Sequence, residues 1–315
     1  MLVVRDLSIK FKTKKGIVTA VRNVSFDLKK GETLGVVGES GCGKSITNMA
    51  IMGLLPPEAI VEAKELSFNG KDLKSLPNKE WQLLRGDHFG IIFQDPMSAL
   101  NPCFTVEFQL AEVIAKVNPG SSIERVRTKA IDLLDKVGIP DPKKRLNCYP
   151  HELSGGMAQR VMIAMAIAGN PDVLIADEPT TALDVTIQLQ ILKLLKEIQK
   201  DNNMAILFVT HDLGVVSQIS DRIQVLYAGE IVEEGPIKQV LTSPHHPYTQ
   251  GLLNSLPKMS EREKELYSIK GTVPGLGDRP PGCQFAPRCD QALGHCSNTS
   301  IKLKDLESSK SRCVL

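Results

Sequence analysis

The segment Gly38–Ser45, with the sequence GESGCGKS, constrains the fold of this chain more than any other stretch. Its spacing matches the phosphate-binding loop G-x-x-x-x-G-K-[ST]. The apolar run 33–37 before it predicts a buried strand, and residues 46–54 after it predict a helix. A strand, a glycine-rich loop and a helix in this order place backbone N–H groups and the positive helix end around one anion. The sequence therefore predicts an α/β phosphate-binding core.

Each residue type in this loop has a defined task. Glycines let the backbone approach phosphates without a Cβ in the way. Lys44 supplies a positive charge for the β- and γ-phosphates, and Ser45 supplies a hydroxyl for Mg²⁺. Cys42 lies near a helix N-terminus and Lys44, so we expect a lowered thiol pKa and loss of ATP hydrolysis on alkylation. The predicted nucleotide contacts of this segment are Gly38, Ser40, Gly41, Cys42, Gly43, Lys44, Ser45 and Ile46.

Composition limits the class of protein. The 315 residues carry 38 Lys plus Arg against 36 Asp plus Glu, a net charge of +2, which is no electrostatic footprint for nucleic acid. No apolar stretch reaches the roughly 18 residues that span a bilayer, and the N-terminus lacks signal-peptide features. We therefore expect a soluble cytosolic chain. Seven cysteines in that compartment favour free thiols, metal binding or redox use over disulfides.

Polar residues follow three predicted buried strands. Gln94 follows the run 90–93, the pair Asp177 and Glu178 follows Val173–Ala176, and His211 follows a further strand. The carboxyl ends of parallel strands form the edge where ligands bind. We expect Asp177 to orient Mg²⁺, with Gln94 beside it, Glu178 to act as general base and His211 to contact the γ-phosphate. Each residue also has a plain interpretation as a solvated strand end.

Two further features are open to a binding interpretation. Ser154, Gly155, Gly156 and Met157 precede an apolar helix and form a second anion-binding helix N-terminus, although a simple helix cap also explains them. Phe11, upstream of the phosphate loop, is a candidate for stacking on adenine or for the core. Residues 1–37 favour β structure and residues 104–170 favour helices. Within the helices, residues 121–124 resemble a capping box.

Together these motifs resemble an ATP-binding cassette domain over residues 1–240. The phosphate loop, Gln94, residues 153–157, residues 173–178, residues 182–184 and His211 stand in the family's order, with Gln159-Arg160 after the signature glycines. The resemblance implies a P-loop nucleotide-binding core with an antiparallel β part and an inserted helical subdomain at about residues 97–168. It implies that Phe11 stacks on adenine. Met157 departs from the family's usual glutamine, and we expect activity to survive.

The resemblance also implies a head-to-tail dimer that binds ATP between two subunits. One chain would supply Lys44, Ser45, Gln94, Asp177, Glu178 and His211. The other would supply Ser154, Gly155, Gly156 and Met157, which explains a second helix N-terminus that the chain's own loop does not fill. Binding of ATP would close the pair, and hydrolysis would let it open, as in a two-state switch biased by its ligand.

The extension 241–315 holds four of the seven cysteines. Cys283, Cys289, Cys296 and Cys313 have the spacing C-x₅-C-x₆-C-x₁₆-C. Four cysteines of this kind are compatible with an iron–sulfur cluster, a zinc site or free thiols, and their spacing disfavours zinc. Residues 271–315 contain few large apolar side chains, so we expect this tail to need a covalent or metal staple or to stay disordered.

This extension is similar to the tail of oligopeptide and dipeptide importer ATPases, through residues 274–276 and 281–289, Cys296 and Cys313. The resemblance implies a [4Fe–4S] cluster on the four cysteines. It also implies the ATPase subunit of a bacterial or archaeal peptide importer, peripheral on the cytoplasmic face of the cell membrane. Its expected partners are a related but different cassette ATPase, two membrane permease subunits docking on residues 97–168, and an extracellular or periplasmic peptide-binding protein. Nucleic acid is not expected, and the alternative is a soluble cassette ATPase in DNA repair or translation.

Overall fold

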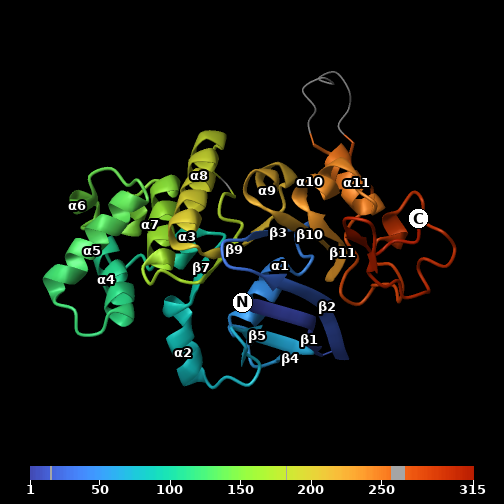
Figure 1. Ribbon diagram of the computed structural model, residues 1–315, viewed down its shortest axis with the longest axis horizontal. Coiled ribbons are helices and arrows are strands. Elements are labelled where there is room, and N and C mark those ends of the chain that lie inside the picture. The colour runs from blue at the N-terminus through green and yellow to red at the C-terminus, as the bar shows by residue number, and fades with distance from the viewer. Residues whose placement is uncertain (15, 182, 257–266) are drawn as a thin grey trace. The chain divides into compact units, whose positions relative to one another are not determined.

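A computed structural model describes residues 1–14, 16–181, 183–256 and 267–315 (Figure 1). The chain divides into two compact units. The first unit comprises residues 1–29, 33–75 and 208–315, and the second comprises residues 30–32 and 76–207. The phosphate loop and the cysteine-containing extension both belong to the first unit.

The first unit contains an antiparallel sheet built on its two longest strands. Its members are β1 (Leu2–Thr13), β2 (Gly16–Leu28), β4 (Ala59–Glu62), β5 (Glu65–Phe68) and β6 (Lys71–Asp72). Their order is β2-β1-β5-β6, and β4 also pairs with β1. Apolar side chains such as Leu2, Val4 and Ile9 are fully buried. The predicted antiparallel β part is therefore confirmed.

A second group of strands in this unit leads to the phosphate loop. Strand β3 (Thr33–Val37) lies parallel to β10 (Arg222–Tyr227), which forms an antiparallel pair with β11 (Glu230–Pro236). Helix α1 (Lys44–Ile51) starts directly after the loop. The predicted order of strand, loop and helix is confirmed, with the helix beginning two residues earlier and ending before Leu54. The other α-helices that the structure describes in this unit are α9 (Leu213–Ile219), α10 (Ile237–Thr242) and α11 (Pro247–Asn254).

The second unit consists mainly of helices that follow one another between two parallel strands. The strands are β7 (Phe89–Ile92) and β8 (Val173–Asp177). Helix α4 contacts α5 and α7, and these helices lie side by side in Figure 1. A mainly helical part is therefore present, while the bounds of about residues 97–168 stay a prediction. The helices of the unit are α2 (Asn78–Asp87), α3 (Pro96–Ala99), α4 (Val106–Val117), α5 (Ile123–Lys136), α6 (Pro142–Arg145), the 3₁₀ turn η1 (Pro150–Glu152), α7 (Gly155–Ile167) and α8 (Val185–Asn202). Strand β9 (Ala205–Thr210) carries the chain back into the first unit.

The start of α5 corrects one prediction. Ser122 is the residue that caps this helix, and its hydroxyl accepts a hydrogen bond from the backbone N–H of Arg125 at 3.3 Å. A capping box needs an acidic or amide side chain at the third helical position. Because Ser122 rather than Ser121 is the cap, Glu124 occupies the second position, and the predicted box at residues 121–124 is wrong. The carboxylate still lies in the first turn, where it complements the helix dipole.

The tail after residue 266 packs onto the first unit. Its short strand β13 (Lys310–Ser311) pairs with β11 and with β12 (Lys304–Asp305), and a 3₁₀ turn η2 covers Ala286–Arg288. Phe285 is 4% exposed, and its ring centroid lies 5.2 Å from that of Tyr227 and 5.3 Å from that of Tyr248. Phe285 of the tail thus joins an aromatic cluster of the first unit. The expectation that the tail needs a covalent or metal staple, or otherwise stays disordered, stays a prediction.

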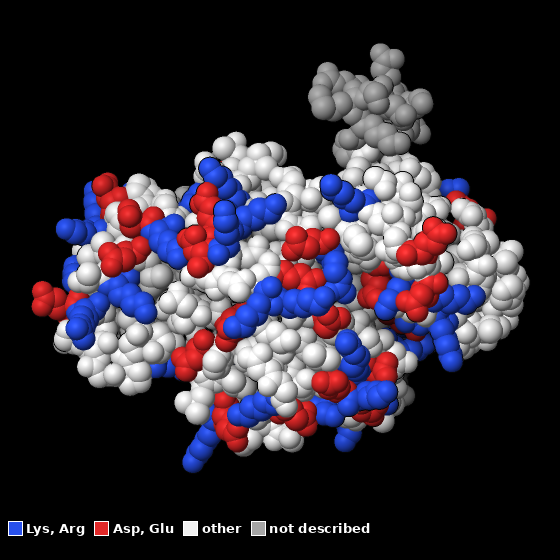
Figure 2. Space-filling model, viewed as in Figure 1, with Lys and Arg blue, Asp and Glu red and all other residues white. Residues whose placement is uncertain are grey.

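Charges of both signs are interspersed over the visible face in Figure 2, as the near-neutral net charge predicts. Among the described residues, no helix combines the length and the apolar character needed to cross a bilayer.

Candidate nucleotide site and cysteine cavity

Hydrogen bonds from the Lys44 side chain to the backbone of the phosphate loop hold the loop in a compact conformation. The Nζ atom of Lys44 donates to the carbonyl oxygens of Gly38, at 2.7 Å, and Glu39, at 3.1 Å. A Cβ at Gly38 would lie 2.1 Å from the backbone oxygen of Leu226, so only glycine fits there. Gly43 has a φ of 106°, a conformation that side-chain-bearing residues rarely adopt. The loop geometry thus requires the glycines that the motif supplies.

Several predicted nucleotide contacts line one cavity of about 280 Å³ in the first unit. Phe11 comes from β1, and Ser40, Gly41 and Gly43 come from the loop. Ile46 comes from α1. Phe11 is only partly buried, which suits a ring that stacks on a ligand better than a core residue. The same cavity is also lined by Val273, Pro274, Gly275, Leu276 and Arg279 of the extension, which sequence reasoning did not connect with the loop.

Cys42 differs from the expectation. Its side chain is 0% exposed, and burial raises the thiol pKa above its ordinary value, outweighing the lowering effect of Lys44. A buried thiol with a raised pKa is poorly reactive. The predicted lowering of its pKa is therefore wrong, and the alkylation expected to block hydrolysis loses its basis.

In the second unit, Glu178 is held in a fixed position at the end of β8. Its Oε2 atom accepts hydrogen bonds from Gln94 Nε2, at 3.1 Å, and from Thr181 Oγ1, at 3.0 Å. Its φ of 49° is left-handed, a conformation that costs about 1–3 kcal/mol for a residue other than glycine. Such strain is common where a side chain must be aimed. The structure thus brings Gln94 and Glu178 together, as a positioned carboxylate and its hydrogen-bond donor.

The neighbouring residues complete the list of strand-end predictions. Asp177 ends the fully buried β8 and is itself 5% exposed. His211 follows β9 directly and is exposed in the first unit, where Asp212 caps α9. The Mg²⁺ role of Ser45, Gln94 and Asp177 and the phosphate role of His211 remain predictions. Of the segment 182–184, Ala182 lies outside the described residues.

The signature residues form the N-terminus of α7 in the second unit. Ser154 is the cap, its hydroxyl accepting from the backbone N–H of Met157 at 3.3 Å, and both Ser154 and Gly155 are exposed. A Cβ on Gly156 would lie 3.2 Å from the Cγ2 atom of Ile187. The helix start therefore presents its N–H groups to the surface, where a ligand held by another chain can reach them.

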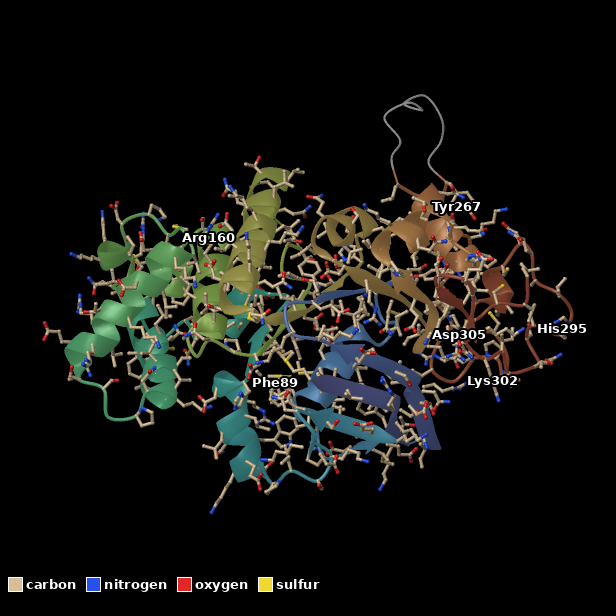
Figure 3. All side chains as sticks on the ribbon, in the orientation of Figure 1. Phe89, Arg160, Tyr267, His295, Lys302 and Asp305 are labelled. Carbon is tan, nitrogen blue, oxygen red and sulfur yellow. The ribbon has the colours of Figure 1, made fainter. Side chains whose placement is uncertain are left out.

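Helix α7 is also bonded to its surroundings. Gln159, 2% exposed, donates from Nε2 to the carbonyl oxygen of Pro179 at 2.7 Å. Arg160, labelled in Figure 3, donates to the carbonyl oxygen of Val137 and to Gln190 Oε1. The bond from Gln159 ties the signature helix to Pro179, the residue directly after Glu178. Sequence reasoning recognised Gln159 and Arg160 as motif residues but did not identify these partners.

The four cysteines of the extension line one cavity. Cys283 and Cys296 are nearly buried, and burial, with smaller effects from Cys289 and Cys313, raises the pKa of Cys283 to about 11. Burial likewise raises the pKa of Cys289, where the nearby Cys313 and Cys296 add to the effect. The four thiols are therefore close enough to influence one another. No group of three or more His, Cys, Asp or Glu side chains within the described ranges is arranged to hold a metal ion.

One buried histidine lines the same cavity. His246 is 1% exposed, and desolvation lowers its pKa to about 3, so the ring is neutral. Its Nδ1 atom accepts a hydrogen bond from the backbone N–H of Tyr248 at 3.1 Å, which leaves the proton on Nε2. The Nε2 atom has no hydrogen-bond partner among the residues that the structure describes. A buried donor of this kind is uncommon and is generally explained by a missing acceptor.

Comparison with known proteins identifies the class. The family described as "ABC transporter" matches residues 21–181, and the family described as "Oligopeptide/dipeptide transporter, C-terminal region" matches residues 232–296. The dipeptide transport ATP-binding protein DppD of Escherichia coli (strain K12) is 50% identical over 314 residues, covering 99% of this chain and 96% of that protein.

The chain belongs to the ABC transporter family.

Other ABC proteins agree with this assignment. The oligopeptide transport ATP-binding protein OppD of Bacillus subtilis (strain 168) is 54% identical over 295 residues, covering 93% of this chain and 82% of that protein. Among solved structures, the dimeric ATP-binding cassette MJ0796 bound to ADP and Pi gives a TM-score of 0.68 at 30% identity, covering 75% of this chain and 99% of that one. The predicted P-loop cassette fold is therefore confirmed, and this ABC chain is an ATPase, for which ATP and Mg²⁺ are expected.

Proposed function

We propose that this chain is the ATP-hydrolysing subunit that powers a dipeptide or oligopeptide importer from the cytoplasmic face of the cell membrane. The observation that carries the proposal is the similarity to dipeptide and oligopeptide transport ATP-binding proteins over nearly the whole chain. The extension matches its own family of peptide-transporter C-terminal regions. The relatives do not favour the alternative of a cassette ATPase in DNA repair or translation.

Hydrolysis would depend on the residues at the strand ends. In the proposed reaction, Glu178 takes a proton from a water molecule as that water forms a bond to the γ-phosphorus of ATP. The bond from the γ-phosphorus to the bridging oxygen breaks, giving ADP and phosphate. The hydrogen bonds from Gln94 and Thr181 to Glu178 support this role, because they fix the carboxylate before substrate arrives. Mg²⁺, when bound, neutralises charge on the phosphates, and Lys44 adds to that neutralisation.

We further propose a head-to-tail dimer with a related but different cassette ATPase. The exposed N-terminus of α7 supports it, since Ser154 and Gly155 are accessible to a nucleotide held by a partner. Two membrane permease subunits complete the assembly, and a separate extracellular or periplasmic protein delivers the peptide. In the helical region, Phe104 and Phe108 are stacked with centroids 4.4 Å apart and are 41% and 50% exposed. Such an exposed aromatic pair supports a docking site for the permeases.

We propose that the four cysteines of the cavity hold a [4Fe–4S] cluster, and their chemistry as a donor set supports this. Four cysteine thiolates are the usual ligands of such a cluster, and here they surround one cavity. A cluster is larger than a single ion, so its ligands need not converge on one point, as the ligands of one metal ion must. The partnerless Nε2–H of His246, which lines the same cavity, supports a bound group there, because such a group would supply the missing acceptor. The cysteines would hold the cluster, which gives the extension a fixed cross-link.

Two measurements test these proposals. A strain lacking this chain should lose dipeptide uptake and regain it with the wild-type protein but not with the Glu178→Gln variant. Anaerobically purified protein should be coloured and contain about four iron atoms per chain, and Cys289→Ser protein should lose the colour. Cys103→Ser is the matched control, because Cys103 is exposed and lies outside the cavity. Intact uptake without the chain contradicts the importer, and iron-free, active wild-type protein contradicts the cluster.

A further inference from the structure

We propose that residues 273–279 of the C-terminal extension form a wall of the nucleotide pocket and bind the base and ribose of ATP. The inference deepens the proposed ATP site and rests on it. Nothing in the phosphate-loop motif assigns a nucleotide contact to the extension. The structure nevertheless places this segment around the same cavity as Phe11 and the phosphate loop.

The cavity has three sides of different origin. Phe11 and Ala20 come from the antiparallel sheet, and Ser40, Gly41 and Gly43 come from the phosphate loop. The third side is the segment that starts at Val273, more than 200 residues later in the sequence. The first two sides carry the residues predicted to hold the adenine ring and the phosphates. A segment that closes the remaining side is therefore next to the part of the nucleotide between them.

The segment is anchored to the sheet by Arg279. The Nη1 atom of Arg279 donates to the backbone oxygens of Thr19 and Ala20, both at 3.0 Å. The close fit depends on Gly229, where a Cβ would lie 2.2 Å from the Ala20 oxygen and 2.8 Å from Arg279 Nη1. The guanidinium is therefore packed in a fixed place and fixes the end of the segment against β2.

The shape and chemistry of the segment suit a planar, partly apolar ligand. The backbone N–H of Asp278 donates to the oxygen of Gly275 at 3.0 Å, which forms a turn and displays the residues before it. Val273, Pro274 and Leu276 give this wall an apolar surface, and Leu276 is 43% exposed. An exposed leucine on a cavity wall loses its contact with water when the face of a purine covers it. The Nε atom of Arg279 is buried without a hydrogen-bond partner in the described part of the chain, which leaves a donor for a polar group such as a ribose hydroxyl.

Titration of the full-length chain with ATP and with inorganic tripolyphosphate tests the inference. Tripolyphosphate occupies the phosphate loop but has no base or ribose. We expect Leu276→Ser to weaken ATP binding by about 10-fold and to leave the Kd for tripolyphosphate unchanged. Leu293→Ser is the matched control, because Leu293 is also an exposed leucine of the extension, 46% exposed, and does not line the cavity.

The outcomes separate the inference from the function on which it rests. Wild-type protein that bound no ATP would overturn the ATP site itself. Wild-type protein that bound ATP, together with a Leu276→Ser variant that bound it equally well, would overturn only the role of the extension. Equal melting temperatures for the two leucine variants show that folding is not the cause. An adenosine-specific loss in a second variant, Val273→Ser, would support the same wall independently.

Discussion

Arg288 in the extension donates from Nη1 to both carboxylate oxygens of Glu39 in the phosphate loop, at 3.1 Å to Oε1 and 3.0 Å to Oε2. The arginine side chain is 6% exposed, and Nη1 also lies 3.3 Å from the hydroxyl of Tyr227. The hydroxyl of Tyr248 also accepts a hydrogen bond from the backbone N–H of Glu39, at 3.0 Å. The residue directly before Cys289 is therefore bonded to the loop that is predicted to hold phosphate.

This ion pair predicts that the extension stabilises the phosphate loop. Arg288→Ala should lower the free energy of unfolding by about 1–3 kcal/mol, because a carboxylate loses its partner in a mostly buried place. ATP affinity should fall as well. Urea titration and ATP binding measure the two effects. Arg127→Ala is the matched control, because the pair Arg127–Glu107 is 48% and 28% exposed and should contribute at most about 1 kcal/mol. Equal losses in the two variants would contradict the role of Arg288.

The fixed position of Glu178 predicts a separation of binding from chemistry. Glu178→Gln should lower the rate of ATP hydrolysis by about 10²–10⁴-fold, since an amide cannot accept the proton, while ATP still binds. Single-turnover kinetics give the rate of hydrolysis, and equilibrium titration gives the Kd for ATP. Glu197→Gln, on an exposed part of α8, should leave both unchanged. A Glu178→Gln variant that hydrolysed ATP at the wild-type rate would remove this residue from the mechanism.

The burial of Cys42 predicts slow alkylation. A raised pKa means that less thiolate is present at any given pH than for an ordinary cysteine, and the side chain is also inaccessible. At pH 8, iodoacetamide should modify the exposed Cys103 while Cys42 stays unmodified, as peptide mass analysis can show. Denatured protein should react at both sites. Fast modification of Cys42 in the folded protein, protected by ATP, would restore the interpretation based on the sequence.

The exposed aromatic pair predicts where the permeases dock. Phe108→Ser should reduce copurification with the permeases and peptide uptake, because it removes an apolar contact from the interface. ATP binding by the isolated chain should not change. Ile17→Ser is the control, since Ile17 is 62% exposed on β2 and lies outside residues 97–168. If both variants copurified like the wild-type protein, the docking site would have to lie elsewhere.

The sequence predicted features that depend on neighbours along the chain. Motif spacing and apolar runs are local, so the phosphate loop, the strand before Asp177 and the antiparallel β part were accessible to it. The gathering of Gln94 and Glu178 at one sheet edge could also be predicted, although 84 residues separate them, because both follow predicted parallel strands. The contact between Arg288 and Glu39 could not, because these residues are 249 apart and no motif or periodicity joins them.

The errors have the same origin. The motif places Cys42 near a helix N-terminus and a lysine, yet its side chain is fully buried, and its backbone oxygen accepts a hydrogen bond from the N–H of Gly229, far away in the chain. The composition of the tail likewise does not show that Phe285 packs on tyrosines of β10 and α11. At the start of α5, the sequence interpretation placed a capping box at residues 121–124, and the geometry shows instead that Ser122 is the cap.

The hydrogen bond from Gln159 to the carbonyl of Pro179 has a consequence for a working pair of subunits. In the proposed dimer, it joins the helix proposed to face the partner's nucleotide to the turn that carries the proposed general base. Turnover in one pocket would then alter the geometry of the other through a single buried amide. Two pockets linked in this way cannot hydrolyse ATP independently. A dimer with Glu178→Gln in one subunit should therefore hydrolyse ATP at less than half the wild-type rate.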